Sequence, residues 1–279
     1  MLLNFINIVI LSIVEALTEF LPVSSTAHLL FFLNFLGLKE IPVFNASIII
    51  MQLGSILAVC FIYKKILFPA NLSQDELKKF LNIYFKIGMA FIPTGICGFL
   101  FYKTIKQIFF VSNIPSAILL IIGGLFLIKD YSKMESKKYT LQNIPFKTMF
   151  IIGLFQALSI FPGVSRSGAT IIGGILLGLE IKTAIEISFF LALPTILAAT
   201  IYEIIFGNFF DANGNAISIL NILSDTNNLY IIISGFCLSF IFAIIIIPSI
   251  LKFTQKNGFR IFGIYRIIIG IIIIILQFI

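Results

Sequence analysis

The sequence predicts an all-α polytopic membrane protein, with six transmembrane helices and two re-entrant helical hairpins in an inverted-topology repeat. Composition is the first observation behind this prediction. Of the 279 residues, 59% are hydrophobic and 11% are charged, which leaves too little polar surface for a soluble domain. Second, the apolar runs are long and continuous, without the period-2 alternation of membrane β-barrels. Third, two similar motifs each interrupt an apolar segment.

Six apolar runs are each near the length that a helix needs to cross a bilayer. They cover residues 43–64, 84–102, 114–129, 184–206, 229–251 and 260–279. Two further regions are interrupted, and in each the second arm is only about a dozen residues long, as in re-entrant segments. The arms are 2–21 and 27–38 around Pro22, and 144–161 and 167–179 around Pro162-Gly163. We interpret each pair as a hairpin that dips into the membrane and returns.

The two interruptions resemble each other in sequence. Residues 15–27 (EALTEFLPVSSTA) align without gaps with residues 156–168 (QALSIFPGVSRSG), with five identities and four conservative matches. This predicts an internal duplication within a single membrane domain of residues 1–279, with repeats of about 1–130 and 144–279. Each repeat is a hairpin followed by three spans, and an odd number of spans reverses the side from which the next hairpin enters. The two tips are therefore expected to meet near the bilayer midplane.

The distribution of charge predicts the orientation. Lysines gather after the first, third and fifth spans, whereas the segment between the fourth and fifth spans carries Asp211 and Asp225 and no Lys or Arg. By the positive-inside rule, both termini lie outside the cytoplasm and the first hairpin enters from outside. Lysine-rich loops that face anionic lipid explain the net charge of +7, so no nucleic-acid partner is predicted.

Two carboxylates precede the first interruption. Glu15 and Glu19 are four residues apart, so a helix places them on one face. Carboxylates at membrane depth are costly and by default functional, and no Lys or Arg lies nearby in sequence to pair with them. We expect either a metal site or a shared proton; Mg²⁺ or Ca²⁺ prefers such oxygen ligands and can bridge to phosphate. A surface pair near the membrane interface is the plainer alternative.

Hydroxyl groups and the single histidine follow Pro22. Ser24, Ser25 and Thr26 open the next arm, where hydroxyls beside free N–H groups predict an anion site, although N-capping is the simpler role for one Ser. His28 lies three residues after Ser25 and four after Ser24, on the same helical face. A Ser–His pair suits a nucleophile and its base. A polar residue bonded within the bundle is the alternative for His28.

The second loop supplies a cation. Arg166 lies between Ser165 and Ser167 at another helix start, and the apolar sequence around it offers no partner. A guanidinium binds phosphate through two hydrogen bonds. Its expected partner is a phosphate, or Glu15 and Glu19 when the site is empty. Together the two loops predict a phosphate site with hydrolytic groups inside a membrane, and hence a lipid phosphate as substrate.

These motifs resemble those of the undecaprenyl-diphosphate phosphatase family, also called bacitracin resistance proteins. The resemblance rests on E-A-L-T-E-F-L-P-V-S-S-T-A-H at 15–28, P-G-V-S-R-S-G-A-T at 162–170, Q-L-G-S-I-L-A-V at 52–59, S-F-F-L-A-L-P at 188–194 and Y-R-I at 265–267. It implies hydrolysis of undecaprenyl diphosphate to the monophosphate, which recycles the carrier lipid for cell-wall synthesis and gives bacitracin resistance. It also implies dependence on a divalent cation, Mg²⁺ or Ca²⁺. The expected location is the bacterial cytoplasmic (inner) membrane, with a site that opens to the periplasmic side.

The resemblance also assigns residues. The positions that match the family's functional residues are Glu15, Glu19, Ser24, Ser25, Thr26, His28, Ser165, Arg166, Ser167 and Thr170. Ala16 and Ala27 stand where family members often have Gly, which trims the room near the loop. Ile48 replaces an acidic residue, so we expect no catalytic role there.

The charges suggest a mechanism for this set. Glu15 and Glu19 hold a cation against the diphosphate, while Arg166 and the loop N–H groups stabilise the transferring phosphoryl group. Ser24, Thr26, Ser165, Ser167 and Thr170 complete the phosphate-binding set. The attacking group is Ser25 or a water, with His28 as base, and the sequence leaves this choice open.

Other classes of protein fit less well. A polyprenyl-phosphate flippase or secondary transporter is the main alternative, because inverted repeats with broken helices describe transporters equally well. A phosphatase with two catalytic histidines is excluded, since the chain has one His. A purely structural protein leaves the acidic and basic residues of both loops as unexplained costs in lipid. The expected partners are a polyprenyl diphosphate and membrane lipids, and a homodimer is allowed but not required.

Overall fold

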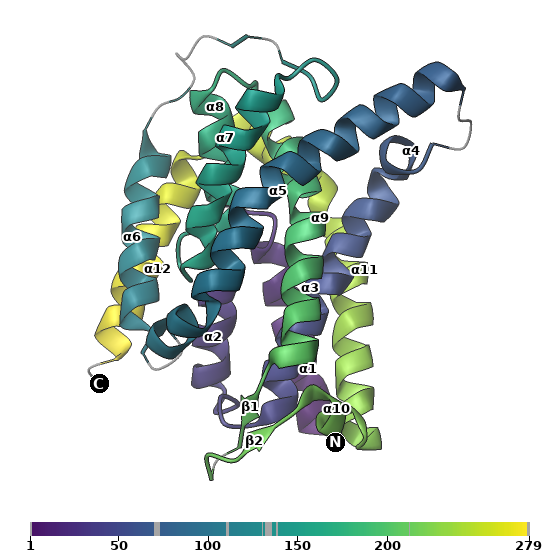
Figure 1. The fold of residues 1–279 in the computed structure, drawn as a ribbon. Helices are drawn as coiled ribbons and strands as arrows, with labels where there is room; N and C mark the ends of the chain where they lie inside the picture. The colour runs from purple at the N-terminus through teal and green to yellow at the C-terminus, as the bar shows by residue number, and fades with distance from the viewer. Residues whose placement is uncertain are drawn as a thin grey trace.

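A computed structural model describes residues 2–69, 73–109, 112–129, 131, 136–137, 139–211 and 213–277. Within these ranges the fold is a helical bundle with one small antiparallel hairpin of two strands (Figure 1). In chain order the elements are α1 (Leu2–Thr18), α2 (Ser25–Phe35), α3 (Pro42–Ile62), α4 (Lys64–Leu67), α5 (Gln74–Phe109), α6 (Ile114–Ile128), α7 (Phe146–Ala157), the 3₁₀ turn η1 (Leu158–Ile160), α8 (Arg166–Leu176), α9 (Ile181–Phe206), β1 (Phe209–Phe210), β2 (Ala216–Ile217), α10 (Ile219–Leu223), α11 (Thr226–Asn257) and α12 (Arg260–Leu276).

Four helices in the described part of the chain are long and apolar enough to cross a membrane. They are α3, α5 over Gln74–Phe101, α9 and α11, and they fall on four of the six predicted runs. The other two runs form α6, with 15 residues, and α12, with 17 residues. Phe99, Leu125 and Ile245 are among the many large apolar side chains that are exposed on the helices, as contact with lipid requires. The chain is an all-α multi-pass membrane protein, while the number of six spans stays a prediction.

Both predicted interruptions are present as breaks between helices. Residues 19–24 separate α1 from α2, and residues 161–165 separate η1 from α8. Pro22 lacks an N–H and its ring clashes with the preceding turn, so a helix does not continue through it. Gly163 has a φ of +101°, a conformation that residues with a side chain rarely adopt. The arms after the breaks, α2 and α8, have 11 residues each, close to the predicted length.

The two broken pairs lie in opposite halves of the bundle. In Figure 1 both termini and the α1–α2 pair lie towards the lower end, whereas α4, α7 and α8 lie towards the upper end. Helices of the two halves also pack against each other: α1 against α11, α5 against α7, and α6 against α12. This arrangement is compatible with the predicted inverted-topology repeat, which itself stays a prediction. The repeat boundaries at about 1–130 and 144–279 stay a prediction.

The first break is anchored in the second half of the chain. Phe20 is fully buried and packs edge-to-face on Phe189 of α9, with ring centroids 5.2 Å apart. Phe20 and Val23 belong to the same hydrophobic cluster as Ile171 of α8. Burial of these side chains therefore holds the first break against the helices of the second half.

Helices α6 and α12 form a close seam because glycines face each other across it. A Cβ added to Gly124 would lie 2.7 Å from the carbonyl oxygen of Gly263, and one on Gly263 would lie 2.7 Å from that of Gly124. A Cβ on Gly270 would lie 2.8 Å from the carbonyl oxygen of Ala117. Small residues allow helix backbones to approach in a membrane, where lipid gives little hydrophobic drive for association.

Candidate active site

The two breaks are in direct contact. The Gly163 N–H donates to Ser24 Oγ at 3.2 Å, and Ser167 Oγ donates to the carbonyl oxygen of Leu21 at 2.8 Å. Each loop thus binds the other through one buried and one partly buried hydrogen bond. The predicted meeting of two motif loops is realised by hydrogen bonds between them.

The same backbone conformation occurs in both loops. Ser24 and Ser165 each have a φ of 71°, and they are the only residues other than glycine with positive φ in the described ranges. They occupy equivalent positions in the alignment of 15–27 with 156–168. Each is the residue before a helix, so α2 and α8 both begin at the contact between the loops. Helix N-termini with free N–H groups attract anions, so two of them lie where an anionic group is expected.

The strain at Ser24 predicts an unusual order of stability. A left-handed conformation costs a residue with a Cβ roughly 1–2 kcal/mol, whereas at ordinary positions Ala is favoured over Gly by about 0.4–1 kcal/mol. Ser24→Gly is therefore expected to be more stable than Ser24→Ala, by up to about 1.6 kcal/mol in the free energy of unfolding, and to unfold at a higher temperature. Both variants lose the hydroxyl, so the comparison isolates the backbone.

The control for this prediction is Ser224, an exposed residue with a φ of −70°. There the Ala variant is expected to be the more stable one. Thermal unfolding of all four variants in detergent measures both differences. Equal stability of the two Ser24 variants would show that the conformation is not strained.

Glu19 connects the chemical groups of the two loops. Ser25 Oγ donates to Glu19 Oε2 at 2.5 Å, and Arg166 Nη2 forms an ion pair with Glu19 Oε1 at 3.1 Å. Arg166 Nη1 donates to the carbonyl oxygen of Ser188 at 2.7 Å. The side chains of Arg166 and Glu19 are only 10% and 6% exposed, so little water screens the pair. Arg166 was expected to pair with a phosphate, or with Glu15 and Glu19 in an empty site. In the structure its ion-pair partner is Glu19.

Glu15 lies behind this centre. Its side chain is 0% exposed, and neither carboxylate oxygen makes a hydrogen bond of good geometry among the described residues, although the Ser55 hydroxyl lies close by. It is close enough to Glu19 for their charges to repel, and close enough to Arg166 for a weaker attraction. An isolated buried carboxylate is very costly, so these oxygens require a proton or a cation. Within the described ranges the acidic, His and Cys side chains form no group of three or more that could hold a metal, so the metal site expected at Glu15 and Glu19 stays a prediction.

His28 faces away from Ser25. Its Nδ1 donates to the carbonyl oxygen of Ser24 at 2.8 Å, because a carbonyl can only accept. In the neutral ring Nε2 then accepts from Tyr265 Oη at 2.9 Å, and the two rings are stacked 5.6 Å apart. The predicted Ser25–His28 pair is therefore not formed in this structure. Tyr265 was missed as a site residue, although it begins the Y-R-I motif.

Thr170 supports Arg166 and does not face the substrate space. Its Oγ1 donates to Ser188 Oγ at 2.8 Å, on the residue whose carbonyl oxygen binds Arg166. Ser188 was also missed, although it opens the S-F-F-L-A-L-P motif. Ser165 and Ser167 share a hydrogen bond of 3.1 Å between their hydroxyls, and Ser165 Oγ also accepts from the N–H of Gly168.

A cavity of about 170 Å³ opens at the contact between the loops. Seven of the ten predicted site residues line it: Glu19, Ser24, Ser25, Thr26, Ser165, Arg166 and Ser167. Gln52, Ser159 and Thr195 add polar groups that the prediction did not include. Glu15, His28 and Thr170 do not line it. The cavity offers one guanidinium, two helix N-termini and a carboxylate bonded to a hydroxyl, which suits an anionic substrate attacked by an activated oxygen.

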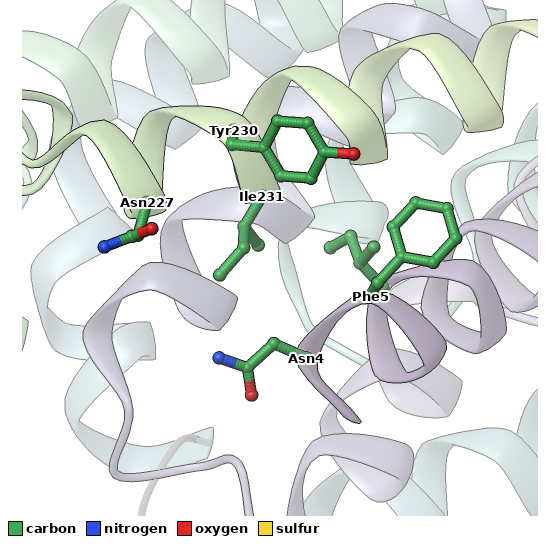
Figure 2. A pocket seen from close by; sticks show the side chains of 6 residues that line it. Asn4, Phe5, Asn227, Tyr230 and Ile231 are labelled. Atoms are coloured by element: carbon green, nitrogen blue, oxygen red, sulfur yellow. The ribbon is translucent and has the colours of Figure 1, made fainter. Parts of the chain in front are cut away.

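A second cavity, of about 310 Å³, lies between α1 and α11 and is lined by six residues. Figure 2 shows Asn4 and Phe5 from one helix opposite Asn227, Tyr230 and Ile231 from the other. The lining contains no charged side chain and no residue of either motif loop. It therefore offers neither a cation for phosphate nor a base, and the smaller cavity is the candidate active site.

Comparison with known proteins identifies relatives over nearly the whole chain. A family model described as "Bacitracin resistance protein BacA" matches residues 8–272. Proteins named undecaprenyl-diphosphatase are similar over nearly the whole chain. That of Sulfurihydrogenibium sp. (strain YO3AOP1) is 45% identical over 267 residues, 95% of this chain and 96% of its own. Those of Persephonella marina and Aquifex aeolicus are 42% and 41% identical over 276 and 267 residues, covering 98% and 95% of this chain and 99% and 95% of their own.

Proposed function

This chain belongs to the bacitracin resistance protein family, and we propose that it hydrolyses undecaprenyl diphosphate to undecaprenyl phosphate and inorganic phosphate. Such a hydrolase returns the carrier lipid to cell-wall synthesis and gives resistance to bacitracin. The observation that carries the proposal is the buried Glu19, which binds Ser25 of its own helical pair and Arg166 of the other. The site lies within a bundle of apolar helices, so a substrate with a long prenyl tail can reach it from the lipid.

The geometry favours Ser25 as the attacking oxygen and Glu19 as its base. The Ser25 hydroxyl already donates to Glu19 Oε2, so Glu19 can take its proton as Oγ attacks the terminal phosphorus. The bond from phosphorus to the bridging oxygen breaks, and undecaprenyl phosphate leaves. A water then hydrolyses the phosphoserine, which releases inorganic phosphate and restores the Ser25 hydroxyl. Trapping of a phosphoenzyme that is lost in Ser25→Ala supports this order, and full turnover by Ser25→Ala points to water as the attacking group.

Arg166 and the two helix starts bind the anion. The terminal phosphate competes with Glu19 for the Arg166 guanidinium, whose other nitrogen stays on the carbonyl oxygen of Ser188. The guanidinium and the free N–H groups of α2 and α8 stabilise the negative charge that develops on the phosphoryl oxygens. In this scheme His28 orients the turn at Ser24 and is not the base.

We propose that Glu19 and Glu15 would hold Mg²⁺ or Ca²⁺. The unpartnered oxygens of Glu15 fit this role, since a hard cation prefers carboxylate ligands. When bound, such a cation would neutralise charge on the diphosphate. Removal of divalent cations with a chelator is expected to abolish phosphate release, and added Mg²⁺ or Ca²⁺ to restore it. Full activity in the chelator would show that Glu15 is neutralised by a proton instead.

Phosphate release from undecaprenyl diphosphate by the purified protein in detergent tests the function. Detergent solution has no membrane gradient, so a flippase or secondary transporter gives no product there. Release with Mg²⁺ or Ca²⁺ present is the expected result, and its absence would overturn the proposal. Broken helices alone suit a transporter, but a carboxylate bonded to a hydroxyl and a guanidinium favours phosphoryl transfer.

We further propose six spans with two re-entrant hairpins in the bacterial inner membrane, and a site that opens to the periplasmic side. Two features support this orientation. The termini lie at one end of the bundle, and α4, which carries Lys64 and Lys65, lies at the other (Figure 1). A homodimer is not required, because one chain supplies all residues of the cavity.

A further inference from the structure

Arg266, in the middle of α12, is an unusual residue for the inside of a membrane protein. It is 1% exposed, and it is the largest side chain in the described ranges that is fully buried. No ion pair between Arg266 and a carboxylate occurs among the described residues. A buried charge without a counter-ion is costly, so its five N–H groups need strong acceptors.

Backbone carbonyl oxygens supply these acceptors. Arg266 Nε donates to Leu120 O at 3.2 Å, and Nη2 donates to Leu119 O at 3.2 Å. These two bonds fix the guanidinium to α6 across the glycine seam. A Cβ on Gly123 would collide with the guanidinium itself, so this glycine makes room for it.

The other bonds reach both motif loops at once. Arg266 Nη1 donates to Pro22 O at 3.1 Å, while Nη2 donates to Gly163 O at 2.6 Å and Val164 O at 3.1 Å. In the alignment of 15–27 with 156–168, Pro22 stands opposite Gly163. One guanidinium therefore holds the equivalent carbonyl of each loop.

We propose that Arg266 is a positioning residue for the phosphatase reaction, which sets the separation between the loop that carries Glu19 and Ser25 and the loop that carries Arg166. The inference rests on the proposed function for its catalytic consequence. Arg266 does not line the cavity, so it acts through the loops and not on the phosphate. A planar guanidinium presents donors in several fixed directions, whereas a lysine ammonium is a single point and cannot span both carbonyls and α6.

The test combines kinetics with a structural measurement. Arg266→Lys is expected to lower kcat by about 10²-fold with little change in KM, because a misplacement of about 1 Å between reacting groups costs that much. Hydrogen exchange is expected to rise in peptides covering 19–25 and 161–165, and to stay unchanged in α3. Arg260→Lys, at the exposed start of the same helix, is the matched control and keeps wild-type kinetics and exchange.

A second variant disturbs the guanidinium without replacing it. Gly123→Ala places a methyl group against the guanidinium and is expected to reproduce the fall in kcat and the faster exchange of both loops. Gly88→Ala is its control, because a Cβ on this helical glycine meets nothing within 4 Å. This pair keeps the test valid if Arg266→Lys does not fold.

The outcomes distinguish a failure of the positioning role of Arg266 from a failure of the proposed phosphatase function. Faster exchange in both loops together with a lower kcat supports the positioning role. A uniform rise in exchange across α3 and the other helices, or a change in one loop only, would overturn it. If the wild-type protein releases no phosphate, the proposed function fails, while the exchange of the two loops still decides whether Arg266 holds them.

Discussion

Glu19→Gln is expected to lower kcat for undecaprenyl diphosphate by about a thousandfold, within the 10²–10⁴ range typical of a general base. The amide keeps the shape of the side chain, and its oxygen can still accept from Arg166 or from Ser25. It cannot take the proton of the Ser25 hydroxyl, which now donates to Glu19 Oε2 at 2.5 Å. Steady-state phosphate release measures the effect.

Two further variants make this prediction specific to Glu19. Glu180→Gln, at the exposed start of α9, removes one negative charge elsewhere and is expected to leave kcat unchanged. Glu19→Asp keeps a base at a greater distance and is expected to fall between Gln and wild type. Wild-type turnover by Glu19→Gln would show that Glu19 is not the general base, and His28 would then be the candidate for that role.

Arg166→Ala is expected to reduce kcat by about 10³-fold or more, since a guanidinium on a transferring phosphoryl group contributes about 10³–10⁵. The variant also leaves Glu19 buried without its ion pair, which makes binding of an anionic diphosphate less favourable still. A rise in KM is therefore expected together with the fall in kcat. The measurement is phosphate release over a range of substrate concentrations.

Arg166→Lys separates charge from geometry at the same position. Lys keeps the charge but cannot bind Ser188 O and the phosphate as a planar fork does, so it is expected to recover only part of the lost activity. Arg260→Ala is the control for loss of one positive charge from an exposed position. An Arg166→Ala protein with full activity would contradict the clamp role.

Local sequence was sufficient to predict where the helices break and which loop residues gather. Pro22 and Pro162-Gly163 interrupt apolar segments for reasons of backbone chemistry that act at any position in a fold. The similarity of the two loops then predicted that they meet, and seven of the predicted site residues line one cavity.

Partners that come from distant segments could not be predicted in this way. His28 was paired with Ser25 because both lie on one helical face, but its ring binds Tyr265, 237 residues along the chain. Arg266 belongs to the Y-R-I motif, but the sequence did not predict a role for it. Its five carbonyl acceptors come from segments that become its neighbours only after α12 has packed against α6. Spacing along a helix gives the face of a residue, and only the packing of helices decides what that face meets.

Arg266 also has a place in the order of synthesis. A chain is made from its N-terminus, so both motif loops enter the membrane before α12 has been translated. A chain that stops before α12 carries Glu19, Ser25 and Arg166 but has nothing to bind Pro22 O and Gly163 O together. The separation of the two loops is therefore expected to be set only after α12 has packed against α6, late in the assembly of the bundle.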